Sequence, residues 1–150
     1  MKTSKKIYLT SWLPLLLWML LIFLLSHQDK DTSSLKVGLI QQILGWIGID
    51  GEWLMTGTRG FFLRKLAHFS EYFILLILSF RVANLYYLPP KTFWIPLLGC
   101  FLYACTDEFH QTFVPGRVGS PIDVGIDTLG AILGIVVIWS LYRKEILFKL

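Results

Sequence analysis

The chain has 150 residues, of which 55% are hydrophobic and 16% charged, and its formal net charge is +4. So apolar a composition excludes an ordinary soluble core and indicates a membrane protein of one domain, covering residues 1–150. The excess of basic residues is better explained by lysines and arginines that set the orientation of a membrane protein than by a surface that binds nucleic acid. No nucleic-acid partner is therefore expected.

The first apolar block predicts a transmembrane helix over residues 7–25, with Pro14 in its first turns, where proline costs least. Lysines precede this block as they do in a signal peptide. However, the block is followed by Ser26-His27-Gln28, without a small-x-small cleavage pattern, so we interpret it as a retained helix. In the polar connection after it, residues 35–47 carry apolar residues at helical spacing and predict a short helix in the membrane interface.

Three further spans are expected, over residues 64–88, 92–111 and 121–142. Pro89-Pro90 ends the first of them, because proline cannot continue the helical hydrogen-bond ladder. The last opens with a capping serine followed by proline at the first helical position. The sequence therefore predicts an all-α polytopic bundle of about four transmembrane helices plus the interfacial helix.

The basic residues predict that both termini are cytoplasmic. With the N-terminus inside, the cytoplasmic segments carry a single acid, Glu145, against Lys2, Lys5, Lys6, Arg81, Lys91, Arg143, Lys144 and Lys149. This is the bias of the positive-inside rule. The expected location is the bacterial cytoplasmic (inner) membrane, in a multi-pass topology.

In that topology the polar ends of the last three spans meet at the outer face of the membrane. On the second span Lys65, His68 and Tyr72 are three and four residues apart and form one stripe, with Glu71 beside it. On the third span Asp107 and Gln111 share a face, flanked by Glu108. The stripe and this face are expected to come together.

The fourth span carries Asp123 and Asp127 on one face, which continues into Gly130 and Gly134. The two glycines form a small-xxx-small pattern that allows another helix to approach closely. Arg117, in the preceding loop, and Lys65 are the natural counter-ions for the acids.

Ionised groups near hydrocarbon cost about 2.5–3.5 kcal/mol at the bilayer centre, so these must be paired, hydrated or placed beside a polar ligand. One interpretation is a salt-bridge network that only pins three helices together. The other is a pocket in which Lys65 and Arg117 hold an anionic headgroup while His68 and Glu108 move a proton. The sequence contains no nucleophile, nucleotide or recognised metal motif, so an enzyme is not favoured and no cofactor or metal is expected.

Three motifs occur in order and at matching spacing: Arg64-Lys65-Leu66-Ala67-His68-Phe69-Ser70-Glu71-Tyr72, Asp107-Glu108-Phe109-His110-Gln111-Thr112-Phe113-Val114-Pro115-Gly116-Arg117, and Asp123-Val124-Gly125-Ile126-Asp127-Thr128-Leu129-Gly130. Over most of its length the chain resembles the VanZ-like family. The resemblance implies a small four-helix membrane protein, and the namesake is linked to glycopeptide resistance, mainly to teicoplanin. Many family members carry Asn where this chain has Asp127.

The resulting hypothesis is that the chain binds or processes an amphiphilic cell-envelope component, such as a lipid-linked wall precursor or a lipid headgroup. Its expected partners are membrane lipids, and an oligomer remains open. A membrane-embedded hydrolase or transferase, with His68, Glu108 and Asp107 as catalytic candidates, is a rival, as is a purely structural or partner-binding protein. The expected ligand-binding residues are Lys65, His68, Glu71, Tyr72, Asp107, Glu108, Gln111, Arg117, Asp123 and Asp127, with Gly130 and Gly134 in helix packing.

Overall fold

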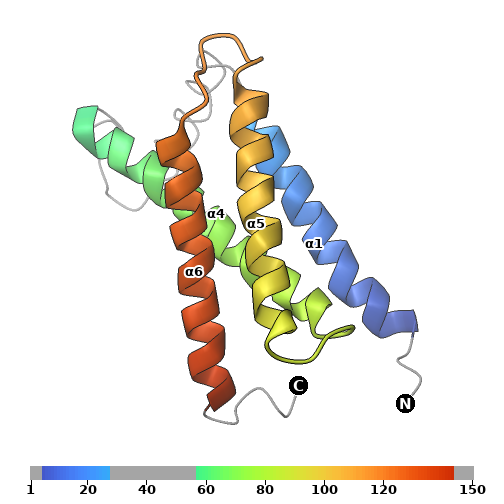
Figure 1. The fold of residues 1–150 in the computed structure, drawn as a ribbon. Helices are drawn as coiled ribbons and strands as arrows, with labels where there is room; N and C mark the ends of the chain where they lie inside the picture. The colour runs from blue at the N-terminus through green and yellow to red at the C-terminus, as the bar shows by residue number, and fades with distance from the viewer. Residues whose placement is uncertain (1–4, 28–56, 144–150) are drawn as a thin grey trace, which may run out of the picture.

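The computed structural model describes residues 5–27 and 57–143, and its regular structure is α-helical (Figure 1). The elements are α1 (Lys5–Ser26), α4 (Gly57–Ala83), α5 (Lys91–Gln111) and α6 (Pro121–Arg143). Since these described ranges contain no strand, the predicted all-α fold class is confirmed. The interfacial helix expected within residues 35–47 lies outside the described residues.

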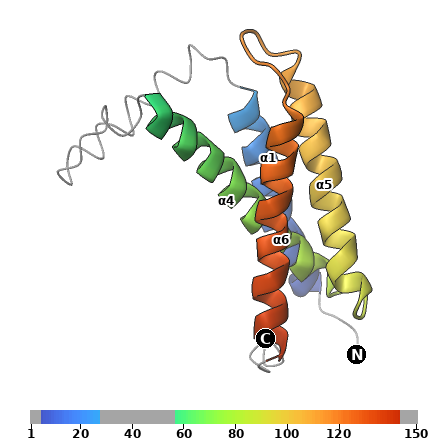
Figure 2. The same ribbon diagram turned by 60° about the vertical axis from the view of Figure 1, so that its left-hand side comes forward.

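The helices form a bundle in which α5 and α6 run antiparallel and α4 crosses obliquely (Figures 1 and 2). The most extensive packing is between α4 and α6, and α1 packs on α4 and, less extensively, on α5. The end of α1, the end of α5 and the start of α6 lie at one end of the bundle, which we call the polar end (Figure 1). The start of α1 and the end of α6 lie at the other.

The second predicted span lies nearer the N-terminus in the structure than the sequence indicated. Helix α4 begins at Gly57 and ends at Ala83, whereas a helix over residues 64–88 was expected. Residues 84–90 instead form a turn in which the amides of Leu85 and Tyr86 donate to carbonyls three residues earlier, 3.0 Å away. Thr92 Oγ1 closes this turn by donating to the carbonyl of Tyr87 at 2.8 Å. The chain leaves the helix before the prolines because α5 must return antiparallel after only a short connection.

Three of the described helices are long and apolar enough to cross a membrane: Lys5–Ser26, Phe61–Ala83 and Pro121–Leu141. A helix of about 20 residues is roughly 30 Å long, which matches the hydrocarbon core of a bilayer. Helix α5 has a similar length, 21 residues, but it carries Lys91, Asp107 and Glu108 and is not among these three. The protein is therefore a membrane protein, and the crossing of α5 stays a prediction.

The contact between α4 and α6 depends on two glycines of α6. A Cβ atom at Gly130 would lie 2.1 Å from the backbone oxygen of Phe69, and one at Gly134 would lie 2.7 Å from Cδ2 of Leu76. In a lipid bilayer the hydrophobic effect does not drive helices together, so they associate mainly through van der Waals packing. Small residues such as glycine favour this packing because they let the two backbones approach closely. Below the polar end this contact buries Tyr72, together with Leu75, Leu76 and Ala131.

Candidate functional site

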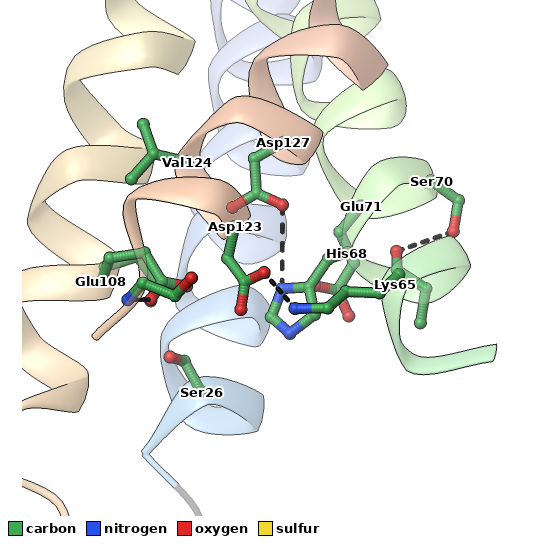
Figure 3. A network of polar contacts seen from close by, with 12 residues as sticks. Ser26, Lys65, His68, Ser70, Glu71, Glu108, Asp123, Val124 and Asp127 are labelled. Atoms are coloured by element: carbon green, nitrogen blue, oxygen red, sulfur yellow. Dashed lines mark hydrogen bonds and ion pairs between the residues drawn. The ribbon is translucent and has the colours of Figure 1, made fainter. Parts of the chain in front are cut away.

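Ionisable and polar side chains gather at the polar end, where four helices contribute to one cluster (Figure 3). We call it the polar cluster, and it consists of Ser26, Lys65, His68, Glu71, Tyr72, Asp107, Glu108, Gln111, Asp123 and Asp127. Asp127 interacts electrostatically with Glu71, Asp107, Glu108 and Asp123. The structure thus brings together residues that lie up to a hundred positions apart in the sequence.

Lys65 on α4 forms an ion pair with Oδ1 of Asp123 on α6, and both side chains are mostly buried. The Lys65 ammonium also lies 5.1 Å from the centre of the Phe61 ring, within the range of a cation–π contact. The sequence indicated Lys65 and Arg117 as counter-ions for the acids, and the structure shows that Lys65 pairs with Asp123. This pair fixes the crossing of α4 and α6 one turn above the buried Asp127.

His68 lies between two carboxyl groups. Its Nδ1 is 3.8 Å from Oδ1 of Asp127 and 3.9 Å from Oε2 of Glu71, distances that allow electrostatic attraction but are longer than hydrogen bonds. The imidazole and the Glu71 carboxyl are about one-fifth exposed, whereas Asp127 is fully buried. Nδ1 of His68 therefore lies close both to a buried carboxyl and to one that is partly exposed.

Four buried polar atoms in this part of the cluster have no hydrogen-bond partner among the described residues: His68 Nδ1, Tyr72 Oη and both carboxyl oxygens of Asp127. Leaving a buried polar group unsatisfied costs about 1–3 kcal/mol, and native proteins rarely do so. These atoms contrast with the neighbouring members of the cluster, which bond to one another.

On α5 the side chains of Asp107, Glu108 and Gln111 are buried and share hydrogen bonds. The amide nitrogen of Gln111 donates to Ser26 Oγ at 2.9 Å and approaches Asp107 Oδ2 and Glu108 Oε1 at 3.3 Å each. It thereby fastens the end of α1 to the end of α5. Ser26 was not among the site residues expected from the sequence, although its position at the polar end of the first predicted span pointed to it.

Glu108 also holds the start of α6. Its Oε2 accepts a hydrogen bond of 2.8 Å from the backbone amide of Ser120, and a negative group is stabilised at a helix N-terminus by the helix dipole. The loop before α6 turns at Gly116, whose φ is 74°, a conformation that glycine adopts without strain. Gly119 then approaches α5 so closely that a Cβ atom there would lie 2.4 Å from the carbonyl oxygen of Glu108.

Arg117 occupies this loop rather than the buried part of the cluster. Its backbone amide donates to the carbonyl of Val114 at 3.1 Å, and the residue is partly exposed. It is close enough to His68 for an electrostatic interaction. Arg117 thus adds positive charge within electrostatic range of His68.

A histidine pair at the polar end was also not expected from the sequence. Nδ1 of His27, just after α1, lies 3.0 Å from Nε2 of His110 on α5, and the two rings stack with their centroids 5.2 Å apart. The His110 ring also packs on Phe23, with a centroid distance of 4.7 Å. This is a second contact that joins α1 to α5.

Within the described ranges, no three or more His, Cys, Asp or Glu side chains are arranged so that they could hold a metal ion. The cluster contains an ion pair and a buried carboxyl beside an imidazole, and an arginine lies close enough to interact with that imidazole. Such groups can bind a polar headgroup or move a proton.

No curated protein and no solved structure matches the chain. The model of the VanZ/LLP1 family matches residues 11–143, which include every described residue of the polar cluster. The chain therefore belongs to the VanZ/LLP1 family.

Proposed function

We propose that this protein binds, at the outer face of the bacterial cytoplasmic membrane, an amphiphilic component of the cell envelope, and that it thereby influences susceptibility to teicoplanin. Lys65 and Arg117 attract the anionic part of a headgroup, and the acids around them set the position of these two cations. Family membership supports the link to the envelope, and the composition of the polar cluster supports the binding role.

The observation that carries the proposal is the unsatisfied part of the cluster. A network that served only to pin the helices would satisfy its members internally, as Lys65 does with Asp123 and as Gln111 does with Ser26. The Asp127 carboxyl and Nδ1 of His68 lie beside those satisfied groups without hydrogen-bond partners of their own in the described chain. Buried polar atoms without partners, beside groups that are already paired, favour a ligand over a purely structural role.

The orientation with both termini in the cytoplasm belongs to the same proposal. The start of α1 and the end of α6 lie at the end of the bundle opposite the polar cluster (Figure 1), so the positive-inside rule directs the cluster outward. A single cysteine placed at Arg117 in a variant without Cys100 and Cys105 should react with a membrane-impermeant maleimide in intact cells. Failure to react before lysis, with reaction after it, would reverse this topology.

The functional test is complementation. The gene is deleted, teicoplanin and vancomycin susceptibility is measured, and the gene is restored as wild type, His68→Ala, Glu108→Gln or Arg117→Gln at equal membrane abundance. The proposal expects all three variants to accumulate and to fail in restoring the wild-type teicoplanin response. Full complementation, or failure only through lost accumulation, would mean that the cluster is structural.

A second candidate function is acid–base catalysis in a membrane-embedded hydrolase or transferase. It is favoured by the position of His68 between Asp127 and Glu71, because a carboxyl beside an imidazole can orient the ring and support its charged form. In that case His68→Ala abolishes turnover while an envelope lipid still binds. In the binding function the same variant weakens retention of the lipid itself.

A further inference from the structure

Asp127 on α6 is fully buried and lacks the hydrogen bonds that its neighbours have. Its side chain has no exposure to solvent, and neither carboxyl oxygen accepts a hydrogen bond from residues 5–27 and 57–143. An unpaired charge in such a place is so unfavourable that a buried ionisable group usually becomes neutral instead. A neutral Asp127 requires a proton on one of its two oxygens.

The ionisable groups around Asp127 are mostly acids. The groups that face it from α4, α5 and α6 are His68, Glu71, Tyr72, Asp107, Glu108 and Asp123. Among the cations of this end, Lys65 is already paired with Asp123, and Arg117 acts on His68 from the loop before α6. A proton on Asp127 removes the repulsion from the neighbouring carboxylates, whereas an ionised Asp127 adds to it.

A proton on Asp127 would also supply a hydrogen-bond donor that this contact lacks. Oδ1 of Asp127 lies 3.8 Å from Nδ1 of His68, and both atoms are buried without a partner in the described chain. A protonated carboxyl can donate to an imidazole nitrogen that carries no hydrogen. The bond requires the two atoms to approach by about 1 Å, which is within the reach of a small side-chain rotation.

His68 reaches from the solvent to Asp127. Its side chain is about one-fifth exposed, although its Nδ1 is buried. Figure 3 shows the ring with one nitrogen toward the Asp127 carboxyl and the other turned away from it. An imidazole in this position can accept a proton at one nitrogen and give one up at the other.

We propose that Asp127 is a proton-binding site and that His68 conducts the proton to it from the solvent at the polar end. In this step a solvent proton binds to Nε2 of His68, the bond between Nδ1 and its hydrogen breaks, and that hydrogen forms an O–H bond with Oδ1 of Asp127. The ring ends as the other neutral tautomer, and no group is oxidised or reduced. The inference concerns a proton rather than an amphiphile, so it does not rest on the proposed function.

Infrared spectroscopy detects such a proton directly, because the C=O stretch of a carboxylic acid is separate from the bands of a carboxylate. The sample is the full chain at neutral pH in dodecyl maltoside, a detergent without a carbonyl group, with a heavy carbon isotope in the side-chain carboxyls of aspartate. The wild type should show an acid band that moves both with this label and in heavy water. Asp127→Asn should lose the band.

Glu71→Gln is the matched control. It removes the other carboxyl that lies near Nδ1 of His68, at 3.9 Å, and it should keep the labelled band. An unaltered band in Asp127→Asn would overturn the inference, as would the absence from the wild type of any acid band that moves with the labelled aspartate. The wild-type measurement needs no variant, so a folding defect cannot obscure the answer.

The route through His68 is tested by the rate at which the band shifts after transfer into heavy water. His68→Gln should slow this shift by at least about tenfold, because the amide cannot take up and release a proton as the ring does. His110→Gln changes a histidine of the same end that lies outside the polar cluster, and it should leave the rate within about twofold of the wild type. Equal rates in His68→Gln and the wild type would overturn the route.

These outcomes are separable from those of the complementation test. If Asp127 carries no proton but the cluster variants still fail to restore the teicoplanin response, only this inference falls. If Asp127 carries the proton and the cluster variants complement, only the proposed function falls.

Discussion

Nδ1 of His68 on α4 lies 3.8 Å from Oδ1 of Asp127 on α6, and the Asp127 side chain is fully buried. The pair crosses the tightest helix contact of the bundle, one turn below the ion pair of Lys65 and Asp123. The two carboxyl groups of α6 are four residues apart, yet one has a cation as its partner and the other has none at hydrogen-bonding distance in the described chain. Because only Asp123 has a cationic partner, we expect the substitution of Asp123 and that of Asp127 to affect stability differently.

Asp127→Asn should leave the stability of the protein unchanged or raise it. The carboxyl receives no hydrogen bond from the described residues, so the burial of its charge is uncompensated, and a neutral amide of the same shape removes that charge. The measurement is the thermal unfolding midpoint in detergent, followed by tryptophan fluorescence. A clear fall in the midpoint would show that the folded protein stabilises this carboxyl.

Lys65→Met and Asp123→Asn should each destabilise the protein, because each leaves a mostly buried partner without its counter-charge. For a pair between the exposed and the fully buried limits, a loss of about 1–3 kcal/mol is expected. The double variant should lose less than the sum of the single variants in a cycle of unfolding free energies. Strict additivity would mean that the two charges do not interact in the membrane protein.

Gly130→Ala should reduce folding and membrane accumulation. The added methyl group would lie 2.1 Å from the Phe69 carbonyl oxygen, and both atoms belong to rigid helices, so the helices must separate at a cost of about 1–3 kcal/mol or more. Gly125→Ala is the control, since its methyl group meets nothing and alanine has the higher helix propensity, by about 1 kcal/mol. Equal unfolding midpoints for the two variants would contradict the close contact.

Gln111→Glu should loosen the end of α1. The amide that donates to Ser26 and faces Asp107 and Glu108 would become a third carboxylate among these acceptors. Hydrogen exchange at residues 23–27 should accelerate, and Gln111→Leu, which removes the donor without adding charge, should have a smaller effect. Unchanged exchange in both variants would mean that other contacts, such as the histidine pair and the hydrogen bond from Tyr103 Oη to the Met19 carbonyl, hold the two helices.

The membrane class, the all-α fold and the approximate helix positions follow from the sequence itself. Hydropathy, prolines and capping residues act over a few neighbouring positions, so they can be interpreted without knowing what packs against them. The same locality explains the error at the second span. Apolar residues continue to Leu88, but the chain leaves the helix after Ala83 because the return to α5 needs a turn.

The sequence also placed the acids and bases at one end of three spans, since helical spacing and topology suffice for that. It did not decide that Lys65 pairs with Asp123, that the Asp127 carboxyl has no hydrogen-bond partner among residues 5–27 and 57–143, or that Ser26 joins Gln111. These contacts depend on how far α4 and α6 are rotated and how closely they approach, which is set by the packing of Gly130 against a backbone sixty residues earlier. Only the tertiary structure fixes such distances, because they join atoms that are remote along the chain.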